Sequence, residues 1–306
     1  MISLVRVDIE FESASNKRFR VFSGAHVRAF VYWILRRKNP VFAEKLHSSK
    51  ELAPFSVTPI MDGGSVINAM ERGKAYSFSV TFFIPEIGEA FKDFLKRASG
   101  VFLAGCEHPL KRAVVRYYGV EDLAGEPVEK FRLRFVTPCY FRRPSRGYRF
   151  IPMPVPELMF RSLARLYEAF VSEIGQEYRE WLDEGGIAVS GFSGRTEKVT
   201  LKGGMWTVGF VGTVNFSLPE DAYSEEFAKI TSMFLRFGEH TNVGGGRTSG
   251  LGMFRVENID NEMSAEKVRT PDERAAGDCG DEGRLCAGAS LSAENGGRPD
   301  QHTFIG

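Results

Sequence analysis

Apolar and polar residues alternate along several segments of the chain, and this period of two predicts half-buried β-strands. In the first such segment, 5–11, four apolar side chains are separated by Arg6, Asp8 and Glu10. Comparable patterns predict further strands at 55–61, 75–84, 101–104, 112–120, 131–136, 187–192, 206–218 and 251–258. Strands are therefore expected along the whole of the first 258 residues.

Between these strands, apolar residues recur at every third or fourth position, which predicts amphipathic helices. The predicted helices cover 25–38, 86–98, 156–183 and 224–237. Pro156 is suited to the first position of its helix, and Ser224 to the cap of the last one. Gly238 is expected to end that last helix.

The order strand, helix, strand, strand, helix, strand occurs twice. It predicts an α+β fold made of tandem ferredoxin-like (RRM-like) βαββαβ domains, each with one sheet face buried under two helices. The polar stretch EDLAGEPVEK (121–130) separates the two patterns. We therefore place the domains at 1–125 and 126–258, the second containing a glycine-rich loop.

Charge is distributed unevenly along the chain. The net charge is +1, but residues 259–306 carry 5 Lys/Arg and 10 Asp/Glu, which leaves a net charge of +6 on 1–258. The acidic segment is rich in small polar residues and lacks apolar periodicity, so we predict that 259–306 is a disordered tail. The mildly basic body is compatible with a nucleic-acid partner.

The composition bears on membrane association, on the cellular compartment and on metal or cofactor binding. No apolar run approaches the roughly 20 residues of a membrane span, so no membrane partner is expected. The 4 cysteines are too scattered for a disulfide framework, which indicates reduced thiols and a cytoplasmic location. Cys106-Glu107-His108 offers two potential metal ligands with no second pair nearby. We therefore expect no metal and no cofactor.

The segment 237–256, FGEHTNVGGGRTSGLGMFRV, is unusually rich in glycine. Five glycines fall within nine positions: Gly244, Gly245, Gly246, Gly250 and Gly252. Glycine lets a backbone adopt positive φ and approach phosphate closely. The order helix, glycine loop, strand excludes Rossmann and P-loop motifs, which need strand, loop, helix. We predict an RNA-binding loop in which Arg247 holds a phosphate bidentately; the alternative is a glycine-rich hairpin of purely structural role.

Candidate catalytic residues lie on and after the first predicted helix. Its apolar face leaves Arg28, Tyr32 and Arg36 together on the other side, one turn apart. His47 and Lys50 follow within 20 residues of Tyr32. An acid/base His, a Tyr and a Lys without a carboxylate cluster are the set that a metal-free ribonuclease needs. The alternatives are a solvated helix face and a histidine at the surface or the rim of the core.

A second basic segment spans 142–150 (RRPSRGYRF) and interleaves arginines with aromatic residues. Such a segment suits phosphate contacts combined with base stacking. The candidate RNA-binding residues here are Arg142, Arg143, Arg146 and Arg149. The alternative is a basic loop that only keeps the chain soluble.

Two segments carry a resemblance to a known family. The glycine segment with its helix-loop-strand context resembles the C-terminal signature of the CRISPR-associated RAMP superfamily. The run AFVYWILRRKNPVFAEKLHSSKELAPFSVTPI (29–60) resembles the repeat-processing endoribonuclease branch of that superfamily. The resemblance covers roughly 1–258 and implies tandem ferredoxin-like domains. Family members commonly place a Tyr on the first helix, a His after it and a Lys shortly beyond, which Tyr32, His47 and Lys50 match.

The resemblance implies a function. The expected activity is cleavage of CRISPR repeat RNA in precursor transcripts by a metal-independent endoribonuclease, which leaves 2′,3′-cyclic phosphate and 5′-OH ends. The alternative is a non-catalytic RAMP subunit that binds guide RNA as a scaffold in an effector complex. A ferredoxin-like protein that binds a small molecule or metal is the third class. Expected partners are repeat RNA and other CRISPR effector subunits, with the protein a monomer or homodimer.

Overall fold

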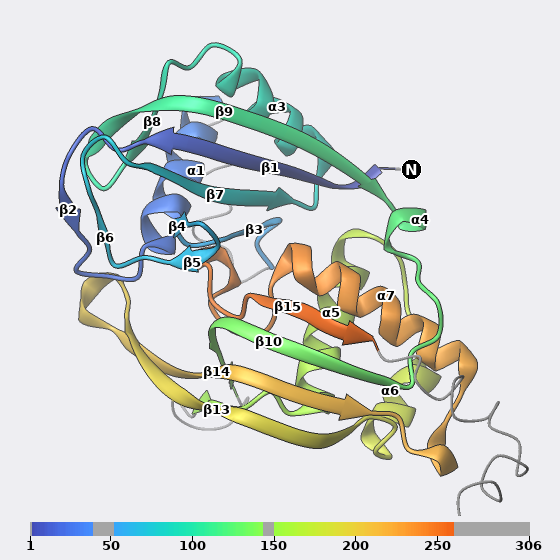
Figure 1. The fold of residues 1–306 in the computed structure, drawn as a ribbon. Helices are drawn as coiled ribbons and strands as arrows, with labels where there is room; N and C mark the ends of the chain where they lie inside the picture. Colours follow the sequence, from blue (N-terminus) through green and yellow to red (C-terminus); the bar gives the residue numbers. More distant parts are fainter. Residues whose placement is uncertain (1, 39–51, 143–149, 260–306) are drawn as a thin grey trace, which may run out of the picture. The chain divides into compact units, whose positions relative to one another are not determined.

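The computed structural model describes residues 2–38, 52–142 and 150–259, which form an α+β fold with two antiparallel sheets (Figure 1). The predicted tail therefore lies outside the described residues, except that the last strand extends to residue 259. Among the helices of these three ranges, none combines the length and the apolar character that crossing a bilayer requires.

The first sheet is built from the N-terminal half of the chain. Its central strands lie in the order β9-β1-β7-β3 and pair antiparallel throughout. They are β1 (Ile2–Glu12), β3 (Phe55–Val57), β7 (Ala75–Phe82) and β9 (Cys106–Gly119). Short strands extend this sheet or pair beside it: β2 (Lys17–Arg18), β4 (Met61–Asp62), β5 (Ser65–Val66), β6 (Ala69–Met70) and β8 (Gly100–Leu103). Two helices pack on one face, α1 (Gly24–Lys38) and α3 (Pro85–Leu95).

The second sheet has the order β13-β14-β10-β15. Its strands are β10 (Lys130–Cys139), β13 (Ala188–Thr200), β14 (Trp206–Ser217) and β15 (Phe254–Ile259). The helices on its buried face are α5 (Pro156–Phe170), α6 (Gln176–Asp183) and α7 (Glu225–Thr241). The remaining short elements are α4 (Val120–Leu123), which joins the two halves, and the pair β11 (Phe141–Arg142) and β12 (Phe150–Ile151). Both sheets have the antiparallel strand order of a ferredoxin-like fold, so the predicted fold class is confirmed.

Each sheet buries its own apolar face. Under the first sheet, Phe30 from α1 and Phe91 from α3 meet edge to face with ring centroids 6.0 Å apart. Under the second, Phe131 from β10 stacks on Phe216 of β14 at 5.0 Å. Each fully buried phenylalanine contributes about 1.5–3 kcal/mol to folding, so these layers account for much of the stability of both halves.

Two predicted helix boundaries are wrong, and both involve glycine. The predicted helix 156–183 is two helices, since α5 ends at Phe170 and Gly175 caps the start of α6. Helix α7 continues through Gly238 to Thr241. A Cβ at Gly238 would lie 2.4 Å from the ring of Phe254, so this glycine allows α7 and β15 to pack closely and does not end the helix.

Two predicted helix starts are confirmed. Pro156 occupies the first turn of α5, and the side chain of Ser224 accepts a hydrogen bond from the backbone N–H of Phe227 at 3.4 Å. Helix α7 ends instead at Thr241, and the capping residue Asn242 has a φ of 58°. Asparagine tolerates a positive φ better than most residues other than glycine.

Candidate functional site

Helix α1 presents the three residues that the sequence grouped together. Arg36 is exposed and Arg28 is half-buried, with its guanidinium 5.5 Å from the ring centroid of Tyr32. The side chain of Tyr32 is only 8% exposed, because its ring packs edge to face on Phe55 of β3 at 5.5 Å. The alternative of a solvated helix face is therefore wrong for Tyr32, which strand β3 covers and which belongs to the core under the first sheet.

A groove of about 760 Å³ opens beside this helix. It is lined by Arg28, Tyr32 and Arg36 of this helix, by residues of the turn after β8 and by residues of the β13–β14 hairpin. Ser249 of the glycine segment also lines it. A Cβ at Gly24 would lie 2.1 Å from the carbonyl oxygen of Ser249, so the start of α1 lies directly against the glycine segment. The structure therefore brings two of the predicted functional regions together.

The glycine segment has the predicted order of helix, loop and strand. Four of its glycines, Gly244, Gly246, Gly250 and Gly252, have positive φ. A Cβ at Gly252 would lie 1.8 Å from the carbonyl oxygen of Val243. These glycines are therefore required by the fold of the loop itself, whatever the loop binds.

The five glycines differ in their access to RNA. Gly250 and Gly252 are buried, and a Cβ at Gly250 would lie 2.7 Å from the backbone nitrogen of Pro59. The RNA contact expected for these two is therefore blocked by protein. Gly244, Gly245 and Gly246 are half-buried and stay candidates for RNA contact.

Arg247 does not face solvent. Its guanidinium donates to the carbonyl oxygens of Phe55 at 2.8 Å and Ala53 at 2.6 Å, and it lies 5.2 Å from the ring centroid of Phe83. Burial lowers its pKa to about 9, and the nearby phenol of Tyr32 partly offsets this shift. The guanidinium of Arg247 therefore binds two backbone carbonyl groups and not the expected phosphate. It fixes the chain immediately after 39–51, the segment that contains His47 and Lys50.

We expect Arg247→Ala to lower the free energy of unfolding by roughly 2–5 kcal/mol, because two buried carbonyl groups lose their charged donor. Arg255→Ala is the matched control, since Arg255 follows the same loop on β15 and is exposed. Urea unfolding at pH 7 measures both. Equal stabilities of the two variants would show that Arg247 has no structural role.

Comparisons with known proteins find similarity to Cas6 proteins in both sequence and fold. The family model for CRISPR-associated endoribonuclease Cas6 matches residues 133–254. The product complex of Cas6 TTHA0078 is 25% identical to this chain and has a TM-score of 0.68, over 84% of this chain and 100% of that one. Residues 133–254 thus match the Cas6 family model, and the chain has the fold of Cas6 structures.

Other Cas6 structures share the fold at lower identity. The product complex of Cas6 TTHB231, a protein of Thermus thermophilus, is 22% identical with a TM-score of 0.69, over 83% of this chain and 99% of that one. The product of a Cas6-related gene from Pyrococcus furiosus is 11% identical with a TM-score of 0.57, over 84% of this chain and 100% of that one. No curated protein sequence matches the chain.

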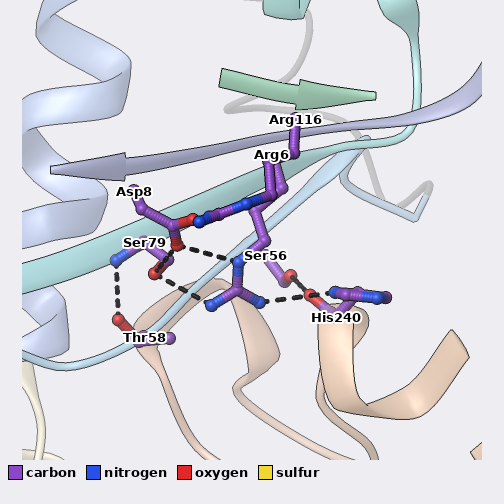
Figure 2. Close-up of polar contacts among 7 residues, drawn as sticks. All are labelled: Arg6, Asp8, Ser56, Thr58, Ser79, Arg116 and His240. Atoms are coloured by element: carbon purple, nitrogen blue, oxygen red, sulfur yellow. Dashed lines mark hydrogen bonds and ion pairs between the residues drawn. The ribbon is translucent and has the colours of Figure 1, made fainter. Parts of the chain in front are cut away.

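The protein also contains a polar network that the sequence did not reveal (Figure 2). On the open face of the first sheet, Asp8 accepts hydrogen bonds from Arg6 at 2.9 Å and from Ser79 at 2.6 Å, and it pairs with Arg116. Burial raises the pKa of the Asp8 carboxyl, but the charges of Arg6 and Arg116 and the bond from Ser79 lower it on balance. Asp8 is therefore a charged anchor between two arginines.

The network continues to His240 near the end of α7. Nη1 of Arg6 lies 3.5 Å from Nδ1 of His240, and Ser56 donates to the carbonyl oxygen of His240 at 3.1 Å. The ring of Tyr118 lies 4.3 Å from that of His240. Burial, with a smaller contribution from the charge of Arg6, lowers the pKa of His240 to about 4. At neutral pH the imidazole is therefore uncharged and joins α7 to the first sheet.

This pKa predicts sensitivity to acid. In the unfolded chain His240 binds a proton near pH 6.5, whereas the folded protein does so only near pH 4. The free energy of unfolding should therefore fall as the pH drops through this window, by up to about 3 kcal/mol from this residue. We expect His240→Gln to flatten the pH dependence between 7 and 4.5 in urea titrations. Burial also lowers the pKa of His108, but His108 is present in both the wild type and the His240→Gln variant. If the free energy of unfolding falls by the same amount between pH 7 and pH 4.5 in both proteins, this role of His240 is contradicted.

Some predicted residues lie outside the described part of the chain, namely His47, Lys50, Arg143, Arg146 and Arg149. Arg142 is described; it is exposed on β11, with its guanidinium 5.9 Å from the ring centroids of Tyr140 and Phe150. It stays a candidate for RNA contact.

The Cys106-Glu107-His108 segment has a structural role for its histidine. His108 is fully buried, its Nδ1 accepts from the backbone N–H of Ala14 at 3.0 Å, and its Nε2 lies 3.2 Å from the carbonyl oxygen of Leu103. Both ring nitrogens are therefore engaged with backbone. Within the described ranges, no three His, Cys, Asp or Glu side chains gather closely enough to hold a metal ion.

Proposed function

We propose that this protein cleaves CRISPR repeat RNA in precursor transcripts, without a metal ion, and so releases guide RNAs. The observation that carries the proposal is the position of Tyr32 and two arginines of α1 in a groove that also contacts the glycine segment. A groove with cationic side chains suits an RNA backbone. Among solved structures with this fold are a substrate mimic complex of Cas6 TTHA0078 and a RAMP protein binding different RNA substrates.

The proposed chemistry is an attack of the substrate's own 2′-OH on the adjacent phosphorus. The 2′ oxygen loses its proton to a base and bonds to phosphorus, while the 5′ oxygen of the next nucleotide leaves and takes up a proton. The products are a 2′,3′-cyclic phosphate and a 5′-OH. The nucleophile belongs to the RNA, and the described residues that line the groove include no carboxylate, so a metal-bound water is not needed.

The residues have distinct roles in this proposal. His47 transfers protons, Tyr32 orients the nucleophile or shares that role, and Lys50 stabilises the extra negative charge of the transition state. Arg28 and Arg36 hold the flanking phosphates. In support of a histidine, one of the matched structures is a histidine-to-alanine variant of Cas6 TTHA0078.

The test uses purified protein, repeat RNA and excess EDTA. We expect cleavage at a single position, with a downstream fragment that polynucleotide kinase labels directly because it carries a 5′-OH. Cleavage that occurs only with added Mg²⁺ would contradict the proposed chemistry. Tight binding without any cleavage would favour the alternative, a scaffold subunit of an effector complex.

A further inference from the structure

The groove beside α1 has an aromatic wall that the proposed chemistry does not use. Phe102 of β8 lines it and is 44% exposed. Its ring stacks on Trp33 of α1, with centroids 6.1 Å apart and planes 24° from parallel. The guanidinium of Arg37 lies 3.9 Å from the ring centroid of Trp33 on the same helix. Phe102 thus has an exposed ring that stacks on Trp33.

The β13–β14 hairpin also lines the groove with apolar side chains. Met205, at the tip of the β13–β14 hairpin, is 64% exposed and lines the groove with Leu201. The groove therefore offers apolar contacts to a flat ligand from both the hairpin tip and Phe102.

The two arginines that line this groove are not accompanied by a lining carboxylate among the described residues. Arg28 and Arg36 line the groove, and neither forms a salt bridge with any residue that the structure describes. A ligand with a flat apolar part and an anionic part would match the aromatic wall and the arginines at once. An apolar protein segment would match only the wall. Nucleotides have both parts, and the groove volume lies in the range of ordinary ligand pockets.

We propose that this groove takes up one unpaired nucleobase of the repeat RNA next to the cleavage position, stacked on Phe102, while Arg28 and Arg36 hold its flanking phosphates. The inference rests on the proposed function, because it places RNA beside Tyr32. Stacking on an aromatic ring tolerates any base but requires that the base be unpaired. Phe102 is therefore a positioning residue that selects RNA with an unpaired nucleotide at this point.

The test is a binding titration with repeat RNA that carries a single 2′-deoxy nucleotide at the cleavage position, so that it stays intact. Loss of one stacked base costs about 1–3 kcal/mol, which corresponds to a rise in Kd of about 5–150-fold. We expect such a rise for Phe102→Ala and near wild-type affinity for Phe102→Tyr, which keeps the ring. The control is Phe192→Ala on β13, because Phe192 is 66% exposed and does not line this groove.

A second set of titrations identifies which nucleotide of the RNA stacks on Phe102. RNAs with one abasic ribose at successive positions around the cut are titrated against wild type and Phe102→Ala. At one position the abasic change should weaken binding to wild type but not to Phe102→Ala. Additive effects at every position, or equal Kd values for Phe102→Ala and Phe192→Ala, would overturn the proposal. Cleavage of unmodified RNA by wild type is measured separately, so failure of the nuclease and failure of the base pocket are distinguishable.

Discussion

His47→Ala should slow single-turnover cleavage of repeat RNA by about 10²–10⁴-fold, the usual loss when a positioned acid or base is removed. Imidazole titrates near neutral pH, so it can accept the proton of the 2′-OH or protonate the leaving 5′ oxygen without a metal. The Kd for uncleavable RNA should change little, since the proposed role is proton transfer and not binding.

His302→Ala is the matched control for this substitution. It removes the same imidazole from the acidic segment 259–306, for which no role in cleavage is expected. Both variants are assayed at saturating protein with the same labelled RNA. A wild-type rate for His47→Ala would show that the catalytic assignment is wrong, although the match of residues 133–254 to the Cas6 family model would stand.

The fold was predictable from the sequence because its strands and helices have regular patterns. The alternation over 5–11 places Val5, Val7 and Ile9 in the core and leaves Arg6 and Asp8 on the open face, as β1 shows. Strand β13 extends to Thr200, well beyond the predicted 187–192. Many side chains of this extension are exposed, so the sequence there carries no alternation to recognise.

The site was only partly predictable, since its key contacts join residues far apart in the chain. Arg247 bonds to Ala53 and Phe55, more than 190 positions earlier, and Arg6 meets His240 across 234 positions. No local sequence pattern predicts contacts between residues that are so far apart in the chain. From the sequence alone, an arginine among glycines is equally consistent with a phosphate-binding residue and with a buried residue that donates to backbone carbonyls. Only its neighbours in the fold distinguish the two.

Tyr32 illustrates a different difficulty. Helical spacing placed it correctly between Arg28 and Arg36, but spacing cannot show that β3 covers that side of the helix. The exposed ring of Phe102 was also missed, because an apolar residue in a predicted strand is normally assigned to the core. Both residues line the groove that defines the candidate site.

Replacing the ribose at the cleavage position by 2′-deoxyribose should abolish cleavage completely. The proposed nucleophile is the 2′-OH itself, so its removal leaves no group to attack phosphorus, whatever the protein provides. Binding should be retained, because the phosphates and bases that we propose the arginines and aromatic residues contact are unchanged.

Single-turnover cleavage of this RNA in EDTA, beside the unmodified repeat, tests the central claim most directly. The account predicts that the unmodified RNA is cut to 2′,3′-cyclic phosphate and 5′-OH ends, while the deoxy RNA stays intact at equal binding. Cleavage of the deoxy RNA at the same position would contradict it.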